Sequence, residues 1–160
     1  MLMRSAFYLT FGAALASGLV AGVFFAFSSF IMPAFARIRP EQSIAAMQAI
    51  NVTVINPAFM LALFGTAVVG VVLIVVALSN SSQPRYTLIL IASAIYIVGC
   101  AGVTMVCNVP LNNALAAVAD GGDSLSVWAR FLKEWTLWNH VRTLASALAC
   151  GLYVAALANR

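Results

Sequence analysis

The chain has 160 residues, of which 64% are hydrophobic and only 8% are charged. Because about a quarter of the residues of a soluble domain are charged, this composition excludes an ordinary soluble domain and indicates a membrane protein. The formal net charge of +4 comes from basic residues scattered singly along the chain, so we expect no nucleic-acid-binding patch.

Four apolar segments are each long enough to cross a bilayer as a helix, which takes about 20 residues. They cover residues 5–32, 57–79, 85–108 and 137–158. Too little chain remains for a separate soluble domain. We therefore expect one domain over residues 1–160, an all-α, four-helix transmembrane bundle with short interfacial helices in its two long loops.

The first segment follows Arg4 as a signal peptide would, but its apolar stretch runs on to Phe30. That is longer than the roughly 7–15 residues of a signal-peptide core, so we expect a retained helix. A ridge of small residues at four-residue spacing favours close helix packing in lipid. It consists of Gly18, Gly22 and Ala26.

Aromatic residues gather toward the far end of this first segment. They suit either an aromatic belt at the membrane surface or the wall of a pocket for an aromatic substrate. For the second interpretation we select Phe24 and Phe27 as substrate-binding residues.

The loop that follows contains a short predicted helix. Pro40 and Glu41 fit its first turn, and its apolar side includes Ile44 and Met47, so we expect it to lie on the bilayer surface.

Two asparagines come before the second span. Asn56 precedes Pro57 and is a good N-cap for that span. Asn51 has no such capping role, which makes it a candidate for substrate binding.

The third span carries Pro110 just beyond its end. A proline disfavours helical angles at the residue before it, so we expect Val109 to leave the helix and the span to end at Asn108. Residues 120–123 read as a turn, with Asp123 or Ser124 capping the next helix. Three amide side chains beside the membrane edge are candidates for substrate binding: Asn108, Asn112 and Asn113.

Residues 135–143 hold the highest density of polar and aromatic side chains. Trp135, Asn139 and Arg142 fall along one helical stripe, and Arg142 is also an i, i+4 neighbour of Trp138, on which it could stack. His140 is turned by about 100° from Asn139. Arg142 could simply extend to the lipid headgroups and His140 could hydrogen-bond between helices, but ionisable groups in a membrane span usually have a function.

With four spans, the loops 33–56 and 108–136 lie on the same side as the His140 end of the last helix, and both termini lie on the other. The candidate polar residues of the loops and of the last helix therefore converge near one membrane face. The counts of Lys and Arg on the two sides, three on the side of the termini and four on the side of the loops, barely differ. We expect cytoplasmic termini, a preference that these counts hardly affect.

Metal and cofactor sites are not expected. A single histidine excludes a bis-histidine haem, and Cys100, Cys107 and Cys150 lie inside predicted spans without the close spacing of a zinc site. No glycine-rich nucleotide-binding motif is present.

Four motifs together resemble the anthrone-oxygenase-like family of small four-span membrane proteins. They are residues 21–27 with Pro33, residues 47–57, residues 108–113 and residues 135–143. The resemblance implies a bacterial cytoplasmic membrane protein that oxidises a flat phenolic or quinol-like aromatic with molecular oxygen and without a cofactor. The characterised fungal members oxidise anthrones to anthraquinones in this way.

Applied to this sequence, the resemblance supports a hypothesis for the chemistry. His140 would act as general base, and Arg142 with Asn139 would stabilise the resulting oxyanion. The flat substrate would be held in a dry, aromatic-lined pocket. Its walls would be formed by Phe24, Phe27, Trp135 and Trp138.

Two other functions fit the sequence. The first is a non-catalytic membrane protein that binds a lipid, a quinone or a partner helix through interhelical asparagines. Such a protein could also form a homo-oligomer. The second is a transporter, which is disfavoured because four spans without repeats or buried acids leave little machinery for alternating access.

Overall fold

The computed structural model describes residues 2–118 and 124–159, which are helical throughout apart from short turns and contain no strand. The turn expected at residues 120–123 lies outside the described residues. Large apolar side chains are exposed along the outer surface, as expected for a multi-pass membrane protein. Four helices are long and apolar enough to cross a membrane: Ser5–Phe35, Pro57–Leu78, Pro84–Ala116 and Leu125–Ala158.

Three of these four spans contain a π-helical segment, labelled η. The first span consists of α1 (Leu2–Ala26), η1 (Phe27–Ile31) and α2 (Met32–Phe35). The second consists of α4 (Pro57–Met60), η2 (Leu61–Gly65) and α5 (Thr66–Leu78). The third consists of α6 (Pro84–Ile95), η3 (Tyr96–Gly102), η4 (Thr104–Asn108) and α7 (Val109–Ala116). The fourth is the unbroken α8 (Ser124–Ala158), and α3 (Pro40–Thr53) lies in the first long loop.

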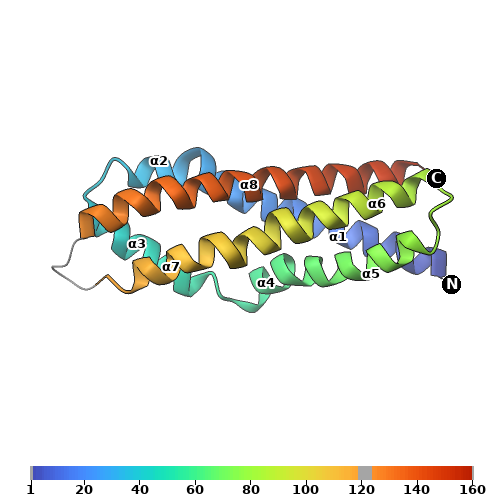
Figure 1. Cartoon of the computed structure of the whole chain (residues 1–160), viewed down its shortest axis with the longest axis horizontal. Helices are drawn as coiled ribbons and strands as arrows, with labels where there is room; N and C mark the ends of the chain where they lie inside the picture. The colour runs from blue at the N-terminus through green and yellow to red at the C-terminus, as the bar shows by residue number, and fades with distance from the viewer. Residues whose placement is uncertain (1, 119–123, 160) are drawn as a thin grey trace.

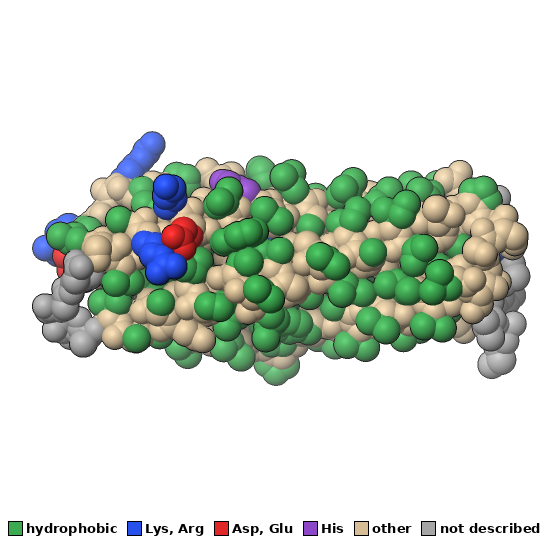
Figure 2. All heavy atoms as spheres, viewed as in Figure 1, with side chains coloured by type: hydrophobic (Ala, Val, Ile, Leu, Met, Phe, Trp, Pro, Cys, Tyr) green, Lys and Arg blue, Asp and Glu red, His purple; other side chains and the backbone are tan. Residues whose placement is uncertain are grey.

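The helices form one elongated bundle (Figure 1). The start of α1, the end of α8 and the short turn between α5 and α6 lie at one end, whereas α3, α7 and the start of α8 lie at the other. This confirms the predicted all-α four-helix bundle and places both long loops at the same end. On the face shown in Figure 2, charged side chains gather at the α3 end and hydrophobic side chains cover the rest of the length.

The third span is longer than expected because Pro110 does not end it. Val109 has helical angles, with φ −61° and ψ −45°, and the helix continues to Ala116. The π-helical segment η4 ends two residues before this proline, as η1 ends two residues before Pro33. A π-helical turn shifts the hydrogen-bond pattern by one residue, so the missing proline amide can be accommodated without ending the helix. The prediction that Val109 leaves the helix was therefore wrong.

The fourth helix is also longer than a bilayer requires. Its 35 residues correspond to about 50 Å, whereas the hydrocarbon core is about 30 Å thick. Its first turns carry Trp128, Phe131 and Trp135, whose rings stack in sequence with centroid separations of 5.7 Å. This aromatic ladder forms the core of the α3 end of the bundle.

The predicted loop helix exists as α3, with Arg39 at the N-cap and Pro40 in the first turn. Its apolar side does not face the bilayer surface. Ile44 and Met47 are buried in the cluster around the aromatic ladder, and Gln48 Nε2 donates a hydrogen bond of 2.8 Å to the Leu115 carbonyl of α7. Helix α3 therefore covers the end of the bundle. Asn56 caps α4 as predicted, since its Oδ1 accepts a hydrogen bond of 3.0 Å from the Phe59 amide.

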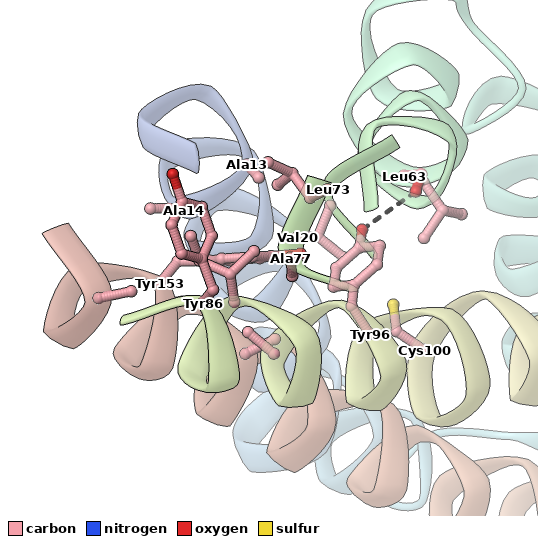
Figure 3. Close-up of a cluster of buried hydrophobic side chains, with 14 of the residues drawn as sticks. Ala13, Ala14, Val20, Leu63, Leu73, Ala77, Tyr86, Tyr96, Cys100 and Tyr153 are labelled. Atoms are coloured by element: carbon pink, nitrogen blue, oxygen red, sulfur yellow. Dashed lines mark hydrogen bonds between the residues drawn. The ribbon is translucent and has the colours of Figure 1, made fainter. Parts of the chain in front are cut away.

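A second core fills the other half of the bundle (Figure 3). Two of its tyrosine hydroxyls are hydrogen-bonded, as buried polar groups normally are. Tyr96 donates to the Leu63 carbonyl of η2 over 3.1 Å, and the Tyr153 hydroxyl lies 2.9 Å from Ser93 Oγ. These bonds connect the spans at points where the packing is otherwise apolar.

The ridge of small residues on α1 makes only one close contact. A Cβ at Gly18 would lie 3.2 Å from Cys150 Sγ, but a Cβ at Gly22 would meet nothing within 4 Å. The closest helix approach is instead at Gly99 of η3, where a Cβ would lie 2.7 Å from Ala145 Cβ of α8. Glycine is required at that position because the two backbones meet there.

We expect Gly99→Ala to destabilise the protein by about 1–3 kcal/mol, the usual cost of overpacking a tight contact. Gly151→Ala is the matched control, since a Cβ there meets nothing within 4 Å and alanine favours a helix over glycine. Thermal unfolding in detergent, followed by circular dichroism, measures both. Equal unfolding temperatures for the two variants would contradict the assigned contact.

Candidate functional site

The polar centre of the bundle is Arg142, whose side chain is only 4% exposed. Its NH2 donates a hydrogen bond of 2.7 Å to Asn139 Oδ1, and its NH1 contacts Thr104 Oγ1 at 3.4 Å. Its Nε is buried and has no hydrogen-bond partner. A guanidinium has five N–H groups, so most of its donor capacity is unused by the protein.

Two aromatic rings enclose this guanidinium. Its central carbon lies 4.1 Å from the centroid of the Phe24 ring and 5.0 Å from that of Trp135. Such contacts stabilise a desolvated cation by about 2 kcal/mol. The partner expected from i, i+4 spacing, Trp138, is not used, because its ring faces outward and is 36% exposed.

No carboxylate compensates this charge in the part of the chain that the structure describes. There, the one ion pair is between Arg130 and Glu134, at 3.1 Å on the exposed face of α8. A buried cation without a counterion is costly unless something else supplies negative charge or hydrogen bonds. Arg142 is therefore suited to receive an acceptor from outside the protein.

Asn139 holds Arg142 in place and uses all of its own donors within the protein. Its side chain is fully buried. Its Nδ2 donates hydrogen bonds of 2.7 Å to the Phe24 carbonyl and to Ser28 Oγ, while its Oδ1 accepts the bond from Arg142. It connects α8 to the first span and does not line the cavity described next.

A cavity of about 220 Å³ opens beside Arg142. Its wall is mostly aromatic and aliphatic, with few polar groups, which is how small-molecule sites are usually built. The aromatic wall residues are Phe24, Phe27, Phe59, Phe64 and Trp135. The polar ones are Arg142, Thr104, Asn51 and Asn112.

The loop asparagines divide into two groups. Asn51 and Asn112 line both the cavity and a neighbouring surface groove between α3 and α7, whereas the exposed Asn113 lines the groove alone. Asn51 Nδ2 is buried without a partner, and Asn112 Oδ1 accepts a hydrogen bond of 2.8 Å from Trp135 Nε1. Asn108 is fully buried, with Nδ2 donating to the Trp135 carbonyl over 3.2 Å, and is absent from the cavity wall.

His140 is separated from this cluster. Its side chain is exposed on the outer surface of α8, where Figure 2 shows the single histidine in purple. The reason is the helical rotation of about 100° between successive residues. Burying Asn139 and Arg142 turns both His140 and Trp138 outward. The expectation that these two residues face the same interior as Arg142 was therefore wrong.

Sequence analysis did not identify several residues of the site. Thr104 and Ser28 are the hydrogen-bond partners of Arg142 and Asn139, and Phe59 and Met47 line the cavity. One signal was available, because Thr104 lies one helical turn before Asn108 and therefore on the same helix face. The other residues become neighbours only through packing between distant segments.

Among the described residues, no group of three or more His, Cys, Asp or Glu side chains is placed to hold a metal ion. Cys100 is buried, Cys107 and Cys150 are half-buried, and all three are free thiols. The groups that line the site are the Arg142 guanidinium, a threonine hydroxyl, two asparagine amides and the aromatic walls.

The comparisons with known proteins identify the family. No curated protein and no solved structure matches the chain. The family model described as anthrone oxygenase matches residues 58–152, which is more than half of the chain. This range includes the third span and most of the second and fourth spans, with Thr104, Asn139 and Arg142. The chain therefore belongs to the anthrone oxygenase family.

Proposed function

We propose that this protein is a membrane-embedded oxygenase that oxidises a flat phenolic or quinol-like aromatic with molecular oxygen and without a cofactor. In an anthrone-type reaction, a ring carbon para to the oxygen-bearing carbon becomes a second carbonyl. One oxygen atom of O₂ enters the product and the other leaves as water. The observation that carries the proposal is the buried, uncompensated Arg142 on the wall of an aromatic cavity.

The guanidinium supports this chemistry by stabilising the substrate as its anion. A phenolate or enolate oxygen placed against Nε would supply the missing hydrogen-bond acceptor and the missing negative charge together. Preorganised donors of this kind are worth most in a site that excludes water. The ring carbon para to the oxyanion becomes electron-rich and can react with oxygen directly.

The proposal assigns no general base to the protein. Among the described residues, the cavity wall contains no histidine and no carboxylate. The substrate proton would pass to water in the groove between α3 and α7, and Arg142 would favour that loss by stabilising the anion. The family-based role of His140 as base is not part of this proposal, because the side chain faces away from the cavity.

The direct test is oxygen uptake by the purified protein in lipid nanodiscs, given a panel of flat phenols and quinols of one to three rings. We expect saturable uptake with one or more of them, and one quinone formed for each O₂ consumed. Saturable binding without oxygen uptake for every ligand of the panel would contradict the oxygenase proposal. That result would favour the alternative function, a non-catalytic binding protein. The described part of the cavity wall contains no histidine or carboxylate, which also favours this alternative.

His140→Ala tests the choice between the two site assignments. Because this side chain is exposed outside the cavity, we expect oxygen uptake within about twofold of the natural protein, as for most surface substitutions. A loss comparable to that of an Arg142 variant, with unchanged folding, would restore His140 as the base.

A further inference from the structure

The cavity volume indicates how much of a flat ligand fits beside Arg142. An engineered apolar cavity of about 150 Å³ holds one benzene molecule. The cavity beside Arg142 has a volume of about 220 Å³, which in proportion is about one and a half benzene rings. Because fused rings share an edge, this corresponds to two fused rings, and a third fused ring would extend into the groove between α3 and α7.

The wall chemistry limits where oxygen can sit on such a ligand. Arg142 lines the cavity and has an unpartnered Nε, and the rings of Phe24 and Trp135 flank its guanidinium. A second unpartnered donor, Asn51 Nδ2, is on α3, where the cavity adjoins the groove. When one oxygen of a flat arene is bound to Arg142, Asn51 Nδ2 is thus an available hydrogen-bond donor for the second oxygen that the reaction adds.

Given the proposed function, on which this inference rests, we infer that the cavity takes a two-ring hydroxyarene of the 1-naphthol type in preference to a three-ring anthrone. The hydroxyl loses its proton, and the naphtholate oxygen pairs with Arg142. The ring carbon para to it forms a C–O bond with O₂ and loses its hydrogen as a proton. Cleavage of the O–O bond then gives 1,4-naphthoquinone and one water. The arene is the reductant, and O₂ is the oxidant.

Ligand binding without oxygen isolates the size question from catalysis. We would titrate phenol, 1-naphthol and anthrone into the protein in nanodiscs under nitrogen, by calorimetry, and subtract the heats of empty nanodiscs. We expect 1-naphthol to bind at least tenfold more tightly than either of the others. Anthrone binding equally well or better, or no saturable binding of 1-naphthol, would overturn the inference.

A change in cavity size should shift this preference. Phe59 lines the cavity and packs edge-on against Phe24 with a centroid separation of 6.2 Å, so Phe59→Ala removes one ring from the wall. We expect this variant to bind anthrone more tightly than 1-naphthol. Phe25→Ala is the matched control, because Phe25 is 60% exposed and lies outside the cavity, and it should keep the natural order of preference.

If Phe59→Ala fails to fold, Phe64→Ala on η2 enlarges the same wall. An unchanged order of preference in a folded cavity variant would overturn the inference. The outcome is distinguishable from that of the proposed function. Preferred binding of 1-naphthol without oxygen uptake would support the inferred substrate size and contradict the oxygenase proposal. Tight binding and oxidation of anthrone would support the oxygenase proposal and contradict the inferred substrate size.

Discussion

Arg142→Gln is expected to lower oxygen uptake with the best phenolic substrate by about 10²–10³-fold, the usual effect of removing one donor to a developing oxyanion. Arg142 is the only charged residue on the described part of the cavity wall. A glutamine side chain ends near the position of the present Nε, short of the NH2 that bonds Asn139, and it cannot supply the positive charge that holds the substrate as its anion. Binding of a phenolate should weaken together with turnover.

The same substitution should not harm folding, which separates this prediction from a general structural defect. A buried charge without a counterion costs stability, so we expect the unfolding temperature of Arg142→Gln to be unchanged or higher. Arg130→Gln is the control, because Arg130 is exposed and paired with Glu134 on the outside of the same helix. Full activity of Arg142→Gln, or an equal loss in Arg130→Gln, would contradict the assigned role.

The fold was largely predictable from the sequence because a span needs only length and apolarity. The four segments were found on that basis, and the Asn56–Pro57 cap was read from local rules. The end of the third span was not predicted correctly, because the effect of Pro110 on the helix depends on the π-helical segment before it. A hydrogen-bond pattern shifted by one residue has no sequence signature that we could recognise.

The orientation of α8 about its own axis was the main difficulty in predicting the site. In a soluble helix, the buried face can be identified because the opposite face is polar. In a membrane, lipid is as apolar as the protein interior, so the pattern of apolar residues does not show which face is buried. The stripe of Trp135, Asn139 and Arg142 and the adjacent His140 were both visible in the sequence. Only the structure shows that the stripe is inside and that His140 is outside.

The cavity wall was less predictable still. Met47 and Asn51 come from a loop helix that we expected on the bilayer surface, and they reach the site because α3 packs across the end of the bundle. That position depends on contacts such as the bond from Gln48 to the Leu115 carbonyl, between residues far apart in the chain. Contacts of this kind cannot be derived from local spacing.

Asn139→Ala should reduce both stability and turnover, because this one side chain makes three hydrogen bonds in the centre of the bundle. Leaving buried groups unpaired costs about 1–3 kcal/mol each. Ser28 Oγ keeps its contact with Thr143 Oγ1, so for the other two partners of Asn139 we expect a total loss of about 2–6 kcal/mol. Arg142 would lose its shortest hydrogen bond and with it a fixed position. A misplacement of about 1 Å at a reacting centre can lower the rate by about 10²-fold.

Asn139→Asp distinguishes a positioning role from simple structural support. The aspartate keeps an acceptor for Arg142 but also places a negative charge 2.7 Å from NH2, where it competes with an anionic ligand for the same cation. We therefore expect Asn139→Asp to weaken binding of a phenolate by at least about tenfold, a difference of about 1.4 kcal/mol. Its uncharged methyl ether should bind with nearly unchanged affinity. A folded Asn139→Asp protein that loses affinity for both ligands equally would show that Asn139 shapes the cavity without acting through the charge of Arg142.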